Sequence, residues 1–277
     1  SNVIRGEDHL SNTSKQILLY LALGYDVPKF AHLPLILGSD GKRLSKRHGA
    51  TSVAEYKKNG YLNTAILNYL SLLGWTPKSN EEIFFPDELI MEFDLLRVSK
   101  ASATFDEKKL NWVSGEHFSK WTAEDLMPLV KPILVEKSIA RENEIKGACL
   151  LKVINLLQSR VTTLNDFAKY GGYFWNAPTA FDEESAERFW PDQSVNESMK
   201  IWMQRLKSLD DFSVENLETA LRDCAEEQGI KAAQLIHATR LAITGMGVSP
   251  GIFQVMSLLG RDQLLTRIEY AIEHLPH

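Results

Sequence analysis

Basic side chains cluster in one short loop near the start of this 277-residue chain. Four of the six residues from Lys42 to Arg47 are Lys or Arg, and they follow an apolar run at 33–37 and a Ser-Asp-Gly turn at 39–41. A buried strand that leads through a glycine turn into a basic loop suits the binding and release of a polyphosphate. A solvated surface loop is the alternative interpretation of the same run.

The order of residues in this loop favours phosphate binding. The run from Arg43 to Arg47, Arg-Leu-Ser-Lys-Arg, resembles the K-M-S-K-S signature of class I aminoacyl-tRNA synthetases, in the K-L-S-K-R form typical of the glutamyl and glutaminyl families. Arg43 takes the place of the first lysine, and Lys46 keeps the second. The resemblance implies that Lys46 and Ser45 are catalytic, with Lys46 neutralising charge on the ATP phosphates. It also implies that Arg43, Leu44 and Arg47 help to bind ATP.

A second stretch, residues 3–13, combines a strand end, a glycine turn and a helix start. It resembles the V-I-R-G-x-D-x-L-x-(N/S)-T segment of the glutamyl-tRNA synthetase family. The resemblance implies that Arg5 and Glu7 bind the substrate, with the guanidinium of Arg5 on the glutamate carboxylate, and that Asp8 and His9 line the ATP side. A surface ion pair of Arg5 with Glu7 or Asp8 is the alternative that the residues alone leave open.

Further blocks extend the resemblance from about residue 3 to the C-terminus. Residues 60–75 and 105–112 resemble the family's G-(Y/F)-L-P-E-A-L-x-N-Y-L-x-x-L-G-W and F-(D/N)-x-x-K-L-x-W blocks, and residues 241–245 with 249–251 resemble its L-R-x-x-L-T-G-x-x-x-(S/T)-P-G pattern. The other class I signature, P-x-G-x-x-H-(I/L/V)-G, is not found in the sequence. We therefore expect a C-terminal part of a bacterial-type glutamyl-tRNA synthetase, without the half that carries this histidine signature and inactive by itself.

Arg160 is the leading candidate for anticodon binding. It precedes Thr162-Thr163-Leu164, and this run resembles the R-x-x-T-L element with which the family reads the first anticodon base. A planar guanidinium can stack on an unpaired base and hydrogen-bond its edge at the same time. Arg240, Ser249 and Pro250 are expected to complete the binding face. For both arginines, capping of helix carbonyls is the alternative.

The hydrophobic patterns place these residues on a mainly α-helical framework. We predict an apolar helix at 12–23 buried on a sheet, a strand at 32–37, and helices through almost all of the chain beyond residue 116, with the aromatic residues near Tyr173 in the core. The resemblance implies a remnant of a Rossmann-like catalytic domain, then an all-helical stem-contact domain and a helical-bundle anticodon-binding domain. The corresponding boundaries are 1–50, 51–115 and 116–277.

Composition limits the class of protein further. The chain is 44% hydrophobic and 24% charged, and no apolar run reaches the ~18 residues that span a bilayer, so we expect a cytoplasmic protein that does not contact membranes. Cys149 and Cys224 lack metal-ligand spacing, and no zinc is expected. The net charge of −5 predicts weak, salt-sensitive non-specific RNA binding.

The resemblance implies a monomeric protein with tRNA(Glu) as its partner, and a parent enzyme that uses ATP with Mg²⁺ and glutamate. Two other functions stay open at this point. The chain could be a non-catalytic tRNA-binding protein built from the same helical modules, or a helical scaffold that does not bind RNA.

Overall fold

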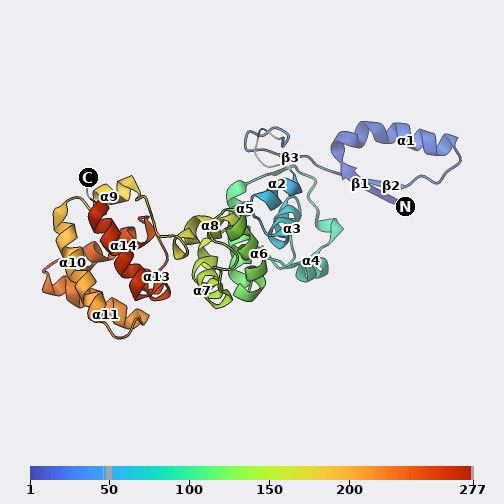
Figure 1. Ribbon diagram of the computed structural model, residues 1–277. Helices are drawn as coiled ribbons and strands as arrows, with labels where there is room; N and C mark the ends of the chain where they lie inside the picture. The colour runs from blue at the N-terminus through green and yellow to red at the C-terminus, as the bar shows by residue number, and fades with distance from the viewer. Residues whose placement is uncertain (46, 48–51, 276–277) are drawn as a thin grey trace. The chain divides into compact units, whose positions relative to one another are not determined.

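The computed structural model describes residues 1–45, 47 and 52–275 of the chain. The chain divides into two compact units, Ser1–Lys120 and Trp121–His277 (Figure 1). All the described strands lie in the first unit, and the described part of the second is helical. An unbroken helix, Glu107–Lys120, crosses the boundary predicted at residue 115, and the units separate at the end of this helix. The boundary at residue 50 stays a prediction.

A small parallel sheet opens the first unit. Strand β1 (Asn2–Gly6) pairs in parallel with β2 (Lys29–Leu33), which brings Arg5 opposite His32. Parallel strands need a crossover connection, and here a 3-10 turn, η1 (Glu7–His9), leads into helix α1 (Leu10–Ala22). The signature segment 3–13 therefore forms the strand end and the helix start that its pattern predicts.

The expected burial of α1 is wrong for its outer face. Thr13 faces the strands and is buried, whereas Leu18, Leu19 and Leu21 are 66%, 60% and 62% exposed. Adjacent strands lie about 4.8 Å apart, so a sheet of two strands is no wider than one helix. Such a sheet covers the near face of α1 and leaves the leucines of the far face in contact with solvent.

The single strand predicted at 32–37 is also wrong, because the chain breaks it at Pro34. β2 ends at Leu33, and a separate short strand, β3 (Ile36–Leu37), pairs in parallel with β4 (Ala103–Thr104). A proline has no N–H group to donate to a strand ladder, so one continuous strand is disfavoured here. The basic loop therefore follows β3 and not β2.

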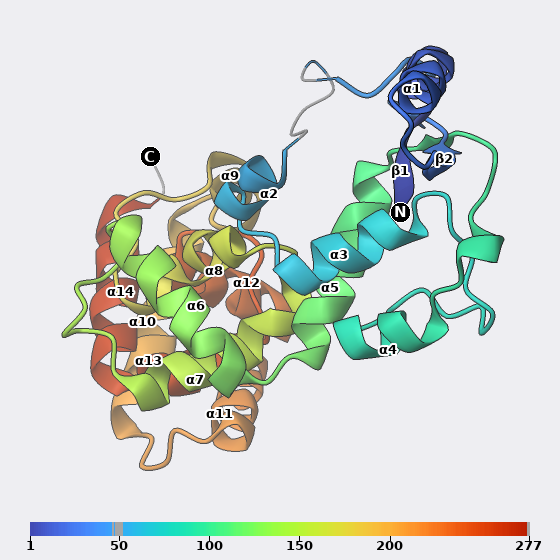
Figure 2. The same ribbon diagram turned by 90° about the vertical axis from the view of Figure 1, so that its right-hand side faces the viewer.

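Helices form most of the rest of the first unit. Their bounds are α2 (Val53–Lys58), α3 (Asn63–Leu72), α4 (Pro86–Glu92) and α5 (Glu107–Lys120), with a 3-10 turn η3 (Leu95–Arg97) after α4. Helices α3 and α5 pack against each other (Figure 2). Ile66 and Tyr69 from α3 meet Leu110 and Val113 from α5, and these four buried residues form the main core of the unit with Tyr56.

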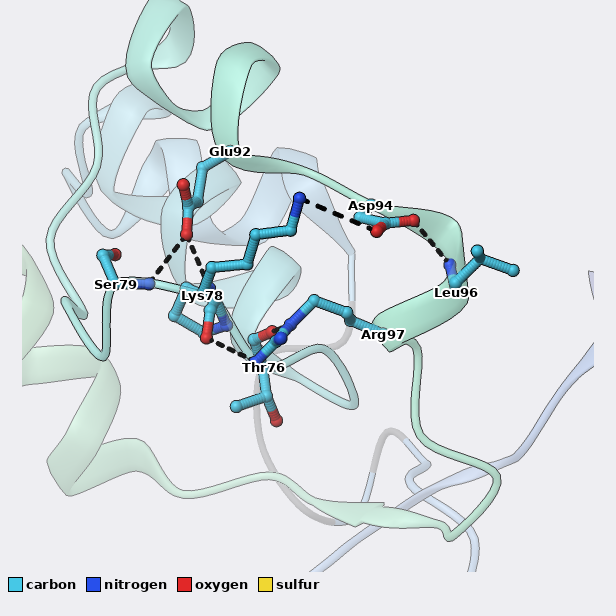
Figure 3. Close-up of polar contacts among 8 residues, drawn as sticks. Thr76, Lys78, Ser79, Glu92, Asp94, Leu96 and Arg97 are labelled. Atoms are coloured by element: carbon cyan, nitrogen blue, oxygen red, sulfur yellow. Dashed lines mark hydrogen bonds and ion pairs between the residues drawn. The ribbon is translucent and has the colours of Figure 1, made fainter.

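Polar contacts close the loop before α4 onto the last residue of α4 and the segment that follows it (Figure 3). The carboxylate of Glu92 accepts hydrogen bonds from the backbone N–H groups of Lys78 and Ser79, at 2.5 and 2.9 Å. Arg97 donates to the carbonyl of Thr76 at 2.7 Å. These side chains satisfy backbone groups that have no strand partner, and so they hold a loop that has little regular structure of its own.

A buried polar cluster links α3 to α5. The Oδ1 atom of Asn68 accepts a hydrogen bond from the Phe84 N–H at 3.0 Å and lies 3.0 Å from Nε2 of His117. Both Asn68 and His117 are fully buried. Because an amide oxygen can only accept, Nε2 of His117 carries the proton, and Nδ1 has no hydrogen-bond partner among the described residues. Burial lowers the pKa of His117 to about 4.

The stability of the first unit is therefore expected to fall in acid. The pKa of His117 is about 4 when folded and near 6.5 when unfolded, so between these values the unfolded chain binds more protons. The contribution of neutral His117 to the free energy of unfolding is complete above pH 6.5. It declines towards pH 4, by about 2 kcal/mol. Urea unfolding followed by hydrogen exchange in α5, at pH 7 and pH 4.5, measures this loss. An equal loss in His117→Gln would show that another group causes it.

The described part of the second unit consists of helices joined by turns, as the sequence predicts. Their bounds are α6 (Ala123–Glu136), α7 (Gly147–Leu157), α8 (Leu164–Gly171), α9 (Glu183–Phe189), α10 (Gln193–Ser208), α11 (Val214–Glu227), α12 (Ala232–Thr244), α13 (Ile252–Leu259) and α14 (Arg261–His274), with 3-10 turns η4 (Gln158–Arg160) and η5 (Gly172–Phe174). The mainly α-helical fold class is thus confirmed.

Two groups of helices build this second unit. Helices α6, α7 and α8 pack against one another, and α10 packs against α11, α12 and α14 (Figure 1). Helix α7 also contacts α13, which joins the two groups. The core contains Trp202 and Leu206 of α10, and Tyr173 and Phe174 are buried, as predicted for the aromatic cluster. The contact between α7 and α13 brings the loop after α7 near the start of α13.

Candidate functional site

Arg5 lies at the end of β1, in the first of two candidate sites. Its Nη2 atom donates to Oγ1 of Thr13 at 2.8 Å and to Oε1 of Gln16 at 2.7 Å. The guanidinium also lies over the Phe30 ring, 5.3 Å from the ring centroid. These partners are neutral. The contacts of Arg5 therefore differ from the surface ion pair with Glu7 or Asp8 that the residues alone left open as the alternative to substrate binding. A half-buried guanidinium held by neutral groups keeps its charge for an incoming carboxylate.

An ion pair joins the two signature segments. Nη2 of Arg43, in the basic loop, lies 3.0 Å from Oδ2 of Asp8, in the turn after β1. A Cβ atom at position 6 would lie 2.5 Å from Oδ1 of Asp8, so a larger residue there would displace the Asp8 side chain from its present position. The pair is largely exposed, so its contribution to stability is small, but it places the ends of both segments together.

A tight turn carries the basic loop away from β3. Leu37 and Arg43 form an antiparallel bridge, and the Gly38 N–H donates to the carbonyl of Lys42 at 2.8 Å. Gly41 has a φ of +71°, which favours glycine. The Leu44 N–H donates to the carbonyl of Ile36 at 2.9 Å, so the signature begins on a fixed backbone.

The remaining predicted residues of this first site have different surroundings. The Oε1 atom of Glu7 accepts a hydrogen bond from the Leu35 N–H at 3.2 Å. His9 is exposed at the start of α1, Ser45 is half-buried and Arg47 is exposed. Lys46, the lysine on which the catalytic prediction depends, lies outside the described residues.

A groove in the second unit forms the other candidate site. Arg160, at the exposed end of η4, lines a cavity of about 550 Å³ together with Pro250 and Gly251. The contact between α7 and α13 builds this groove, because Arg160 ends the 3-10 turn η4 that follows α7 and Gly251 directly precedes α13. Residues that are 90 positions apart in the chain thus share one surface. The groove is also lined by Lys152, Asn155, Leu156, Ser159, Val214, Gln254, Ser257 and Leu258.

Arg240 is anchored beside this groove by two neutral acceptors. Its Nε atom donates to Oγ of Ser249 at 3.1 Å, and Nη1 lies 3.0 Å from Nδ1 of His237. The Ser249 hydroxyl in turn donates to the carbonyl of Pro250 at 2.9 Å. Burial, and then the charge of Arg160, lower the pKa of Arg240. The four residues predicted to form the anticodon-binding face therefore lie in one cluster.

The cluster has a positive field. Arg267 is 3% exposed and donates to the carbonyl of Ile243 at 2.8 Å, and burial lowers its pKa to about 10. The charges of Arg160, Arg267 and Arg240 act on the buried hydroxyl of Tyr173, which has no hydrogen-bond partner in the described part of the chain. Burial nevertheless raises the pKa of Tyr173. Several cations around neutral groups favour an anionic ligand.

Sequence reasoning missed the polar face of α7 and the support behind Arg240. Lys152, Asn155 and Ser159 all line the groove, and their spacing places them on one side of the helix that leads to Arg160. This spacing was a usable signal. Sequence spacing could not have identified His237 or Arg267. His237 contacts Arg240 and Arg267 contacts the carbonyl of Ile243, and both contacts depend on side-chain directions in the packed helices.

Two further features of the described residues bear on function. No three His, Cys, Asp or Glu side chains in the described ranges are grouped so that they could hold a metal ion. Within the same ranges, every helix is too short or too polar to cross a bilayer.

Comparison with known proteins identifies the families that the two units match. Residues 1–112 match the family described as the catalytic domain of class I tRNA synthetases (E and Q), and residues 122–272 match the anticodon binding domain family. A glutamate–tRNA ligase from Moorella thermoacetica is 42% identical over 273 residues, which cover 98% of this chain and 56% of the relative. Glutamate–tRNA ligase 1 from Caldanaerobacter subterraneus subsp. tengcongensis is 40% identical, over 99% of this chain and 57% of the relative.

Solved structures give the same result. The crystal structure of a glutamate tRNA ligase from Elizabethkingia meningosepticum in complex with its amino acid superposes with a TM-score of 0.86 at 33% identity, over 100% of this chain and 57% of that chain. The chain therefore belongs to the class I tRNA synthetases of the glutamate and glutamine group, with the anticodon binding domain of that family. It spans somewhat more than half the length of the curated relatives that it matches.

Proposed function

We propose that this chain is the part of a glutamate–tRNA ligase that carries the ATP-phosphate loop and binds the stem and anticodon of tRNA(Glu). The observation that carries the proposal is the assembly of Arg160, Arg240, Ser249 and Pro250 at one positively charged groove. A groove of this kind suits an unpaired RNA segment, because arginine can stack on a base and attract the neighbouring phosphates. The relatives named above add weight to this proposal.

The first candidate site would serve amino-acid activation in a protein of the relatives' full length. Arg5 would hold the glutamate carboxylate, and the signature from Arg43 to Arg47 would approach the phosphates of ATP, which is commonly bound with Mg²⁺. The Asp8–Arg43 pair supports this proposal because it brings the substrate-side segment and the loop together. The proposed protein acts as a monomer in the cytoplasm.

A competition experiment tests the RNA part of the proposal. The 277-residue chain would be titrated with labelled tRNA(Glu) in filter binding, against unlabelled tRNA(Glu) or an unrelated tRNA, at several salt concentrations. We expect tRNA(Glu) to compete at lower concentration, and both affinities to fall as salt rises, because phosphate contacts release counterions. Equal competition by both tRNAs would contradict specific recognition, and no binding at low salt would favour a scaffold without RNA binding.

Replacing Arg160 with alanine is expected to lower the affinity for tRNA(Glu) by about tenfold to thirtyfold. The reason is the loss of one guanidinium that contacts a base, for which about 1–3 kcal/mol is usual. The same filter assay measures the change. Arg222→Ala is the matched control, because Arg222 is an exposed arginine of the same unit that pairs with Glu218 and does not line the groove. A similar loss in both variants would show a general charge effect and not a specific contact.

A further inference from the structure

His237 lies one helical turn before Arg240 on α12 and contacts it directly. The Nδ1 atom of His237 is 3.0 Å from Nη1 of Arg240. A guanidinium has only donors, so Nδ1 must be the acceptor in this contact. His237 is therefore neutral here, with its proton on Nε2. Protonation of Nδ1 would remove the acceptor and place a second positive charge beside Arg240.

The imidazole is fixed by packing as well as by this hydrogen bond. It stacks on the ring of Phe189 from α9, with a centroid distance of 4.3 Å and an angle of 7° between the planes. The charged groups that face it are Arg240 on its own helix and Arg188 on α9, whose guanidinium lies over the same Phe189 ring at 5.1 Å. Burial, and then these two cations, lower the pKa of His237.

The two anchors of Arg240 determine where its guanidinium points. Ser249 binds Nε from the turn before α13, and His237 binds Nη1 from α12. The contacts found in the described residues leave Nη2 for another partner. Because Ser249 is also bonded to Pro250 of the groove, the guanidinium is held in a single orientation next to the proposed RNA path.

We propose that His237 is a positioning residue for RNA binding: its neutral imidazole holds Arg240 against the groove, and protonation of Nδ1 releases Arg240, so that affinity for tRNA falls in acid. This inference rests on the proposed function. The direction in which tRNA affinity changes in acid distinguishes this inference from a general effect of charge. An added positive charge on an RNA-binding surface ordinarily strengthens binding, whereas here the loss of the oriented guanidinium is expected to outweigh the added charge.

The affinity of the 277-residue chain for a tRNA(Glu) transcript would be measured at constant salt at pH 7.5 and pH 5.5. We expect the wild type to bind more weakly at pH 5.5, by less than the roughly tenfold that a histidine with its ordinary pKa would give, because burial and the two neighbouring cations lower the pKa of His237. His237→Asn keeps an acceptor oxygen near the place of Nδ1 and does not titrate, so its affinity should be the same at both pH values within about twofold. His274→Asn is the control, because His274 contacts Tyr270 and not Arg240, and it should keep the wild-type pH dependence.

A second measurement separates this inference from the proposed function. Nitrogen-15 NMR of the free chain reports the tautomer of His237 without any RNA, and we expect the proton on Nε2 at pH 7.5. A proton on Nδ1 would overturn the inference, as would wild-type binding that is unchanged or stronger at pH 5.5. If no tRNA binds at any pH, the proposed function fails and the RNA role of His237 fails with it. If tRNA binds but His237→Asn keeps the wild-type pH dependence, only the inference fails.

Discussion

Replacing Lys46 with alanine is expected to slow adenylate formation by about two to three orders of magnitude in a chain of the relatives' full length. In the proposed reaction the glutamate carboxylate attacks the α-phosphorus of ATP, the bond to the pyrophosphate oxygen breaks, and the adenylyl group is transferred to the carboxylate as pyrophosphate leaves, so negative charge has to be neutralised as the bonds change. Loss of one positioned charge contact with a transition state commonly costs this much. Glutamate-dependent exchange of pyrophosphate into ATP measures the step without requiring tRNA transfer.

Lys42→Ala is the matched control for this experiment. Lys42 is an exposed lysine of the same loop but lies before the signature, and its backbone N–H is bonded to Asp40 at 3.0 Å. We expect exchange to stay within about twofold of the wild-type rate in this variant, because the Lys42 side chain is exposed and the charge of a solvated side chain is screened. Unchanged exchange in Lys46→Ala would refute the catalytic role, and equal losses in both variants would show that only the total charge of the loop matters.

Replacing Asn68 with alanine is expected to destabilise the first unit by about 3–5 kcal/mol. The fully buried amide accepts from the Phe84 N–H and donates to the carbonyl of Glu82, both at 3.0 Å, and it also pairs with His117. Alanine would leave the Phe84 N–H and the Nε2–H of His117 buried without partners, and each such group costs about 1–3 kcal/mol. Because the chain has two units, hydrogen exchange of α3 amides under native conditions is a better measure than one global unfolding curve.

Ser71→Ala provides the comparison for Asn68→Ala on the same helix. Ser71 is half-buried, and in the described contacts its hydroxyl makes only an exposed hydrogen bond, to the Leu67 carbonyl of its own helix at 2.8 Å. Its loss should change stability by less than about 0.5 kcal/mol, as is usual for surface substitutions. If the two variants were equally stable, the buried cluster would not be a main support of α3 and α5.

The pairing of Arg5 with neutral partners has a consequence for the proposed substrate. Asp8, which could have neutralised Arg5, instead pairs with Arg43 of the basic loop. The guanidinium of Arg5 is therefore held in place without a carboxylate, and a free carboxylate of the substrate can complete its contacts. The same ion pair gives the loop a fixed point close to the substrate side of the site.

Local signals in the sequence predicted most of the helices correctly. The mainly α-helical fold class is confirmed, and the helices expected beyond residue 116 are present in the described part of the second unit. Helix starts are set by short-range contacts, such as Ser52 with Glu55 or Thr122 with Asp125, and such contacts can be read from neighbouring residues. The break at Pro34 could also have been inferred from the sequence, since proline has no N–H group to donate to a strand ladder.

The sequence by itself thus determined the family resemblance, the helical framework and the residue types at both sites. The tertiary structure alone decided that the outer leucines of α1 are exposed, that Arg160 and Pro250 share a groove, and that His237 holds Arg240. The physical reason is the range of the interactions. Helix periodicity and capping depend on residues a few positions apart, whereas the width of a sheet, the contact between α7 and α13 and the direction of a side chain depend on packing between distant segments.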